Sequence, residues 1–535
     1  MIVMKKKALV VLLVALPLFV VAYRPTKRHH VEHFYPKTPS ALSYDIAGYF
    51  LKARDYFGVV ADSAQVRALV VPHAGYSYSG LSAASAYQVL FEQDVDGKQV
   101  KNKKIKRVII LAPSHSVGFD GVALPEYGIY ETPLGGIPVD TNAVDQLVKD
   151  RPLFKLVDRV HDKEHSLEVQ LPFLQSTIAD FKIVPLIIGR LADDDYERIV
   201  RKLKPFMDDT TLVVVSSDFT HHGHIYHYQK FSKDIFYHVR RLDSAVIETI
   251  LDKSYTGFDD FFKRQWPTVC GKTGIMVLLK MIEDGVLNDV EGRLASYYTS
   301  PQMTAAQSRG YYRLFETVAD SLMRNSVSYA GIVFTKQKVA NMPLRERLTG
   351  YEQRALLQSA RDVIYNEFMT GHNKLDEWLC EPVLTPQLKG KAGAFVTLKA
   401  RQGNLRGCVG SIRALDPLYF TVLQNAKSAA FRDSRFAPLR IRELSSVTID
   451  ITVLEPPRPV ASYHDIKLGT HGIILKKEGR AAVFLPQVPG QFGWDLPTTL
   501  THLSEKAGLL PDAWKQGSAF EVFEGFEFAE HPMIR

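Results

Sequence analysis

The chain has 535 residues, more than one hydrophobic core usually supports, so two or more domains are expected. Hydrophobic residues make up 46% and charged residues 23%, which excludes extensive disorder. The net charge of +8 is spread thinly, and its densest basic run, residues 101–107, directly precedes an apolar strand. This run is predicted to be a solvated loop, so no nucleic-acid partner is expected.

The first residues differ in kind from the rest of the chain. Three lysines, Lys5 to Lys7, precede an apolar run from Ala8 to Tyr23. This run is shorter than the 20 or so residues of a spanning helix, and the small residue Ala22 suits cleavage of a secretory signal. The alternative is an uncleaved anchor. Residues 1–29 are therefore predicted to direct export, leaving the protein in the periplasm or held at the outer face of the cytoplasmic membrane, with membrane contact through this segment alone.

Residues 30–338 are predicted to form an α/β domain with a mixed sheet. Short apolar, β-branched runs alternate with helical stretches, and the continuously apolar runs are typical of strands buried on both faces. The predicted strands are Arg67–Val71, Arg107–Leu111, Ile183–Ile188 and Leu212–Val215. The predicted helices are Leu81–Gln93, Asp194–Phe206, Gly274–Glu283 and Gln307–Met323.

A break in the pattern at residues 339–347 is predicted to be a linker. Thr349 and Glu352 then form the spacing of a capping box, and a helical apolar face follows. Two hairpins are expected later, Ala394–Ala400 with Leu405–Ile412 and Gly472–Leu475 with Ala481–Leu485. Residues 348–535 are therefore predicted to be a smaller α+β domain.

Polar residues follow three of the predicted strands at the point where each strand ends. His73 and His115 come soon after two of them, and Asp218 follows a third, with His221 just beyond. In an open α/β sheet, ligands bind beyond the carboxyl ends of the strands. If these strands are parallel, the four side chains converge on one rim, which turn residues alone would not explain.

Cys270 adds a soft sulfur ligand, and it stands directly before an apolar helix that begins at Gly271. A thiol at a helix N-terminus is expected to have a lowered pKa and to bind metal as the thiolate; the alternative is a small buried cysteine. Two imidazoles and one thiolate suit iron, zinc or copper. The other cysteines, Cys380 and Cys408, lie too far apart in sequence to suggest a disulfide framework.

Six strings in order, VVPHAGYSYSG, LAPSHSVGF, EHSLEVQLPFLQ, VVSSDFTHHG, TVCGKTG and NSVSYAG, resemble the Memo family, also called AmmeMemoRadiSam system protein B. The resemblance implies a fold like that of the class III extradiol dioxygenases and metal ligands at His73, His115 and Cys270. It places Asp218 and His221 beside the metal as a carboxylate that orients an imidazole. The residues it implies as pocket lining are Tyr76, His165, Glu168 and His222, the last standing where the family often has tryptophan.

The remainder of the chain resembles the AMMECR family, AmmeMemoRadiSam system protein A, through LRGCVG, FRDSRFAPL, THGI and FLPQV. Five residues of these motifs are predicted to line one cleft, in which arginines clamp an anionic substrate: Arg406, Cys408, Asp433, Arg435 and His471. The alternative is an internal network of ion pairs that holds the hairpins to the helices.

The first functional hypothesis is a non-haem oxidoreductase, with iron favoured over copper or zinc, in which Asp218 and His221 are catalytic and His221 transfers protons. The second is a non-enzymatic protein of the cell envelope that binds metal or an anionic peptide. A weaker third is copper or iron handling. The substrate, a small molecule or a peptide, is not identified, and the family name implies a radical-SAM partner.

Overall fold

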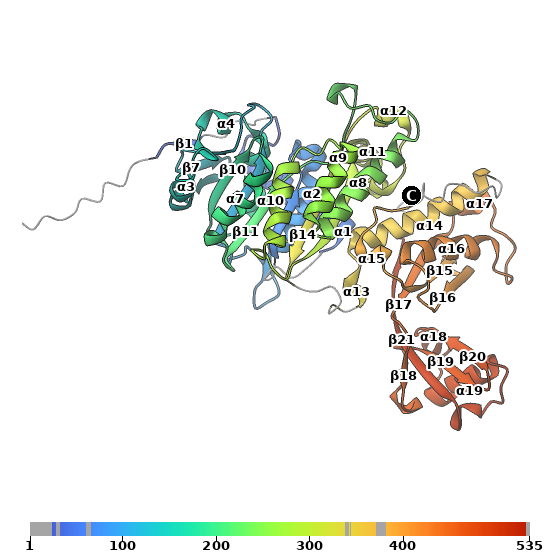
Figure 1. The fold of residues 1–535 in the computed structure, drawn as a ribbon. Helices are drawn as coiled ribbons and strands as arrows, with labels where there is room; N and C mark the ends of the chain where they lie inside the picture. The colour runs from blue at the N-terminus through green and yellow to red at the C-terminus, as the bar shows by residue number, and fades with distance from the viewer. Residues whose placement is uncertain are drawn as a thin grey trace, which may run out of the picture.

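The computed structural model describes residues 24–27, 33–59, 66–336, 342, 344–370 and 381–530. A larger part built on a mixed sheet is followed by a smaller part with an antiparallel sheet (Figure 1). The predicted fold class, α/β followed by a smaller α+β domain, is confirmed. The apolar run at residues 8–23 and Cys380 lie outside the described residues. Within the ranges described, no helix has both the length and the apolar character that crossing a membrane requires.

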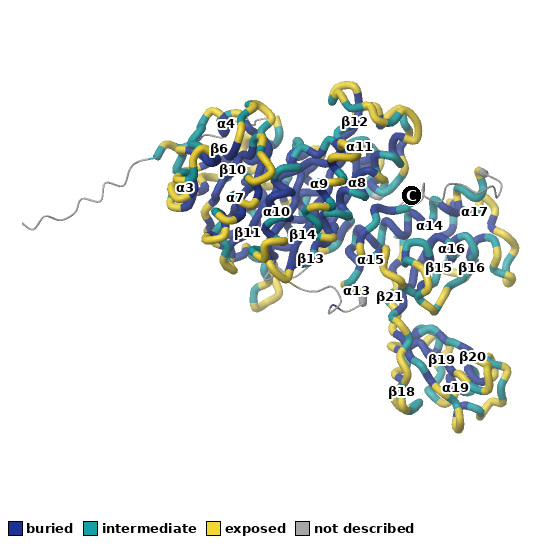
Figure 2. The backbone as a smooth tube through the Cα atoms, in the orientation of Figure 1, coloured by how far each residue is buried: buried dark blue, intermediate teal, exposed yellow. Residues whose placement is uncertain are grey.

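Four parallel strands form the centre of the first sheet, in the order β2, β11, β5, β10. Their bounds are Val66–Val71, Thr211–Ser216, Arg107–Pro113 and Lys182–Ile188. Nearly every residue in them is buried (Figure 2). The four predicted strands are confirmed, and their parallel pairing places all four carboxyl ends at one edge of the sheet.

Shorter and antiparallel strands extend this sheet on both sides. On one side β14 pairs with β2, and both β13 and β12 pair with β14; on the other side β6 pairs with β10, and β9 with β6. Their bounds are β14 Asn325–Thr335, β13 Glu291–Thr299, β12 His221–Gly223, β6 Val122–Leu124 and β9 Phe154–Leu156.

Helices cover the sheet. The pair α10 and α7 packs over the central strands, and α2, with α1 beside it, packs against β2, β13 and β14 (Figure 1). Their bounds are α10 Lys272–Glu283, α7 Asp193–Leu203, α2 Tyr76–Tyr87 and α1 Pro39–Phe57. Two further helices, α8 and α9, span Ile235–Leu251 and Tyr255–Gln265. The predictions at residues 194–206 and 274–283 are confirmed.

Two helix predictions need correction. The helix expected at Leu81–Gln93 instead spans Tyr76–Tyr87. Serines rather than apolar residues fill part of its buried face, and Ser82 and Ser85 both bond to Ser296. The helix expected at Gln307–Met323 is wrong. Gly310, at φ 111°, ends α11 (Ser300–Arg309), and a 3-10 helix at Tyr311–Phe315 and the short α12 (Asp320–Met323) follow.

A short strand packs the N-terminal end of the described chain onto the first part. Strand β1, Thr26–Lys27, pairs in parallel with β7, Ile129–Thr132, and β7 pairs with β8, Gly135–Pro138. The packed region therefore begins before residue 30, where the sequence places the start of the domain.

The second part consists of two lobes on one antiparallel sheet. Its long strand β21, Ala519–Ala529, pairs with β17 through its second half and with β19 through its first half, so it joins the lobes (Figure 1). Each lobe has its own apolar cluster. Both predicted hairpins are present. Strand bounds are β15 Gly393–Lys399, β16 Leu405–Ser411, β17 Thr448–Leu454, β19 His471–Lys477 and β20 Arg480–Phe484. Helix bounds are α16 Leu418–Phe431, α17 Ile441–Leu444 and α19 Leu496–Lys506.

Helix α14, Gly350–Thr370, belongs to both parts. The expected capping box is present: Thr349 Oγ1 accepts from the Glu352 amide, and the Glu352 carboxylate accepts from the Thr349 amide. One face of α14 joins the core of the second part, and Tyr351 packs against Phe57 and Phe315 of the first. Within the predicted linker, residues 344–347 form the short helix α13.

Truncating a residue on the inner face of α14 is expected to destabilise the second part. Leu356 is fully buried, so Leu356→Ala should lower its free energy of unfolding by about 2–5 kcal/mol. Tyr365→Ala is the matched control on the same helix; with this side chain 47% exposed, a change of about 0.5 kcal/mol or less is expected. Urea denaturation measures both. Equal denaturation midpoints for the two variants would contradict the packing described here.

Candidate metal centre

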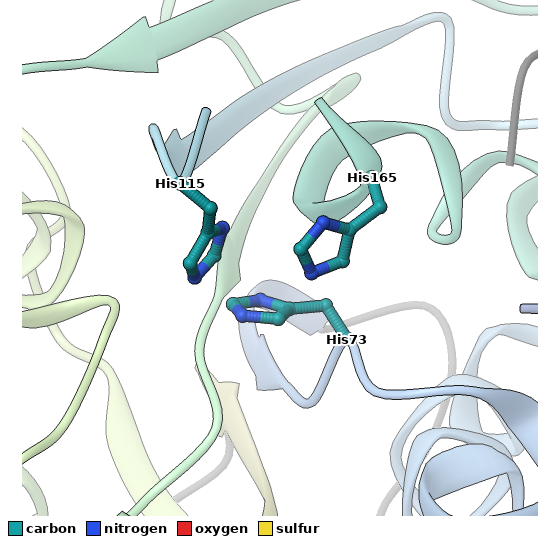
Figure 3. Close-up of side chains that lie close together, drawn as sticks. All are labelled: His73, His115 and His165. Atoms are coloured by element: carbon teal, nitrogen blue, oxygen red, sulfur yellow. The ribbon is translucent and has the colours of Figure 1, made fainter. Parts of the chain in front are cut away.

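Three imidazole rings lie together at the carboxyl end of the first sheet, and we call His73, His115 and His165 the imidazole cluster (Figure 3). One nitrogen from each ring lies within 4.8 Å of the others. Ring centroids are 5.1 Å apart for His73 and His115, 4.6 Å for His115 and His165, and 5.5 Å for His73 and His165. His73 follows β2, His115 follows β5, and His165 begins the one-turn helix α5, His165–Glu168.

The hydrogen bonds around His73 determine which of its nitrogens carries the proton. His73 Nδ1 lies 2.8 Å from Ser216 Oγ. Ser216 donates its single hydroxyl hydrogen to the Ser166 carbonyl and accepts from Gln170 Nε2, so it acts as an acceptor toward His73. His73 therefore carries its hydrogen on Nδ1, and Nε2 keeps a lone pair for a ligand.

Glu164 orients His115 in the same way. Its carboxylate accepts from the His115 backbone amide at 2.6 Å and from Nδ1 of the same residue at 2.9 Å. Burial of Glu164 alone would raise its pKa, but the hydrogen bonds from His115 and Ser166 outweigh burial and lower that pKa to about 2. The ionised carboxylate accepts the Nδ1 hydrogen of His115, which orients the ring and turns its Nε2 away from Glu164.

The third ring, His165, also turns Nδ1 toward Glu164, at 3.5 Å. Burial and the neighbouring His115 lower the pKa of His165 to about 4, and burial with the surrounding imidazoles lowers the pKa of His73 well below its ordinary value. Both rings are therefore neutral near pH 7, the form that binds metal. The side chains of His115 and His165 are 33% and 21% exposed, so solvent reaches the cluster.

Cys270 lies beside the imidazole cluster, just before α10. Its Sγ is 3.1 Å from His73 Nε2 and accepts from the Asp218 amide at 3.2 Å. The expectation of a lowered thiol pKa is wrong: burial and the nearby Asp218 carboxylate raise the pKa of Cys270 well above its ordinary value. In this arrangement the thiol is protonated and can donate to His73 Nε2, so a metal ion has to displace that proton to bind the thiolate.

Asp218 and His221 are both at the site, but they do not form the expected pair. Asp218 is buried, and its carboxylate accepts from the His73 backbone amide at 2.8 Å. His221 Nδ1 instead contacts two carbonyl oxygens, those of Phe219 at 2.9 Å and Thr268 at 3.0 Å. The carbonyls orient the ring of His221, while Asp218 orients the backbone that presents His73.

Three of the residues expected to line a pocket have other roles. Glu168 is buried and bonded to Lys27 and Tyr35. The hydroxyl of Tyr76 donates to the Val169 carbonyl. His222 stacks on Phe231, with its nitrogens near the carbonyls of Phe231 and Met323. Of the four pocket residues expected, His165 alone lies in the imidazole cluster.

Sequence reasoning missed two residues that orient the cluster, Glu164 and Ser216. Glu164 stands directly before His165 in the motif EHSLE, and this adjacency of a carboxylate and an imidazole is the signal that could have found it. Ser216 carries no such signal. It is a short polar residue at the end of a buried strand, and only the packing of α5 against that strand end shows what it bonds.

The residues expected to line one cleft in the second part form separate contacts. The Cys408 amide donates to Asp433 at 2.8 Å, and Arg435 donates both to Asp433 and to the Cys408 carbonyl. Arg406 instead pairs with Glu443 at 2.9 Å. These contacts match the alternative of an internal ion-pair network.

His471 is the fifth residue of that set, and it lies in the other lobe. Its Nδ1 accepts from the Lys467 amide at 3.0 Å, and its Nε2 is 3.5 Å from Arg458. Burial and the charge of Arg458 lower the pKa of His471. None of the contacts described for His471 involves the Cys408 network, so the predicted cleft is not assembled from all five residues.

Two family models match separate regions of the chain. One described as Memo-like protein matches residues 27–312, and one described as AMMECR1 matches residues 357–528.

Individual proteins are also similar to this chain. A Caenorhabditis elegans protein named memo-1 homolog is 33% identical over 225 residues, which is 41% of this chain and 61% of the worm protein. Protein MEMO1 of Xenopus laevis is 31% identical over 258 residues, 47% of this chain and 82% of the frog protein. A solved structure of an uncharacterized protein from Pyrococcus horikoshii is 31% identical to this chain, with a TM-score of 0.30, over 33% of this chain and 90% of the Pyrococcus chain.

Replacing the carboxylate that orients His115 is expected to weaken metal binding. Glu164→Gln removes the negative charge that fixes the Nδ1 proton, and such changes lower metal affinity by about 10–100-fold. A competition titration with a chromophoric chelator and zinc measures this. Glu443→Gln, which alters an ion pair of the second part, is the control and should leave affinity unchanged. Equal affinities for Glu164→Gln and the unmodified chain would show that Glu164 does not orient a ligand.

Proposed function

Because this chain belongs to the Memo-like family and carries an AMMECR1 domain, we propose that its first domain is a metal-dependent, dioxygenase-like oxidoreductase. The observation that carries the proposal is the imidazole cluster. One nitrogen from each ring lies within 4.8 Å of the others, and the Nδ1 atoms are turned to Ser216 or Glu164. Imidazole nitrogens from three separate segments of the chain, gathered within this distance, are a donor set that suits a transition metal.

The donors fit iron, copper or zinc better than magnesium or calcium, which prefer oxygen ligands. His73 and His115 belong to the ligand set in every version of the proposal. The third ligand is either Cys270, as the family resemblance implies, or His165, as the imidazole geometry supports. A thiolate ligand requires loss of the Cys270 proton on binding, whereas His165 is already neutral.

Iron is the metal we favour, because a bound redox-active ion supplies electron-transfer chemistry with dioxygen that zinc does not. The chain's own residues supply orientation and proton transfer. His221 is held through Nδ1 by two carbonyls, so its Nε2 can accept or donate a proton at the site. Asp218 holds the His73 backbone in place through its carboxylate.

The setting of this chemistry is also part of the proposal. The apolar run at residues 8–23 supports export, with the protein periplasmic or anchored at the outer face of the cytoplasmic membrane. Fusion keeps the two domains at high effective concentration and supports joint action on one substrate, with the radical-SAM partner implied by the family name.

Metal content and oxygen consumption of single variants test the proposal. His73→Ala should abolish iron binding in anaerobically purified protein, since a His73 nitrogen lies within 4.8 Å of the other two imidazoles and its Nε2 lies 3.1 Å from Cys270 Sγ. Cys270→Ser and His165→Ala then identify the third ligand: its loss should lower iron occupancy about tenfold or more, and loss of the other residue should leave occupancy near that of the unmodified chain. Elemental analysis measures all three.

Oxygen consumption with phenolic candidates then separates an enzyme from a binding protein. Turnover that stops in His221→Ala while iron stays bound would support the oxidoreductase. Iron-loaded protein that consumes no oxygen with any candidate would favour the non-enzymatic alternative, a metal- or peptide-binding protein of the cell envelope. Iron content unchanged by His73→Ala would reject the site itself.

A further inference from the structure

We infer that Lys27 is a positioning residue of the metal centre, acting through Glu168 and α5 on His165; the inference rests on the version of the proposed metal site in which His165 is the third ligand. Helix α5 has only four residues, His165–Glu168, so its own hydrogen bonds cannot fix its orientation. Contacts from outside the helix must therefore hold it.

A buried ion pair holds the far end of α5. Lys27 Nζ lies 2.6 Å from Glu168 Oε2, and the two side chains are 4% and 1% exposed. The second carboxylate oxygen accepts from the Tyr35 hydroxyl at 2.9 Å. Both oxygens of Glu168 are thus occupied by side chains from the N-terminal segment, in surroundings where an unpaired charge is strongly disfavoured.

Lys27 is itself fixed to the domain. Strand β1 pairs with β7, with Lys27 opposite Tyr130, and Lys27 Nζ lies 5.4 Å from the centre of the Tyr130 ring. These contacts hold the Lys27 ammonium against Tyr130, and the ion pair places the Glu168 carboxylate beside it.

The same N-terminal segment contacts the metal-binding end of α5. Phe34 stacks on His165, with ring centroids 4.4 Å apart and an interplanar angle of 23°. Lys27 and Tyr35 hold Glu168 at the last position of α5. Phe34 packs on the ring of His165 at its first position. The segment thus contacts both ends of the turn that directs His165 toward His73 and His115.

A purely stabilising ion pair is the alternative. It predicts that loss of Lys27 lowers stability without any particular effect on the metal centre. A positioning role predicts a loss of metal affinity that depends on His165 being present, because the effect reaches the ion only through that ring.

Cobalt(II) affinity of the full chain, followed by its visible absorption, tests this dependence. Lys27→Met should lower affinity about tenfold or more in the otherwise unmodified chain, yet by less than about twofold when His165→Ala is already present. Lys27→Arg, which keeps the charge, should restore part of the affinity. Arg107→Met is the control, since it breaks the Arg107–Asp140 pair at the opposite end of the sheet; it should leave affinity unchanged.

Equal losses in both backgrounds would overturn the inference, as would a loss of the same size from Arg107→Met. If Lys27→Met does not fold, Tyr35→Phe removes one hydrogen bond to Glu168 and should show the same dependence on His165 at a smaller size.

A metal-free readout keeps this result separate from the proposed function. In the full chain with ¹³C-labelled histidine, the His165 Cε1–Hε1 signal, assigned from its absence in His165→Ala, should shift in Lys27→Met but not in Arg107→Met. No cobalt binding by the unmodified chain would reject the metal site, whereas an unmoved His165 signal would reject the role of Lys27.

Discussion

Parallel pairing of β2, β11 and β5 is the constraint on which the candidate centre depends. Because their carboxyl ends meet at one edge, His73, His115 and Asp218, far apart in sequence, lie within a few ångströms of one another. The strands are buried on both faces, so a shift in their register would disrupt close packing on both sides of the sheet. The close-packed sheet therefore holds the two strand ends that carry His73 and His115 in fixed positions.

Burial of polar groups at this edge also determines its chemistry. Each buried donor or acceptor needs a partner, and Ser216 and Glu164 meet that need at Nδ1 of the rings. The opposite nitrogens are turned away from these partners, and desolvation keeps His73 and His165 neutral. The same desolvation protonates Cys270, so one physical effect favours imidazole ligation and opposes thiolate ligation until an ion arrives.

The second part is joined to the first through α14, which places residues in the cores of both. Further contacts cross between the parts: Arg293 donates to the carbonyls of Glu346 and Arg347, and the Leu384 amide donates to Ser244. Polar as well as apolar groups are therefore buried between the two parts, whereas domains joined only by a flexible linker would not share such contacts. The two domains therefore form a packed unit.

The sequence by itself determined the buried strands, the helix that follows Cys270, the capping box at Thr349 and the two hairpins, because hydrophobic period and capping are local properties. It also predicted that histidines would follow strand ends. Only the tertiary structure decided which polar groups meet. Glu164, Ser216 and Lys27 act through contacts between residues distant in the chain, and the pKa of Cys270 depends on burial that outweighs the effect of its helix. These contacts and this pKa depend on desolvation and on partners brought together by folding. Neither can be read from a short stretch of sequence.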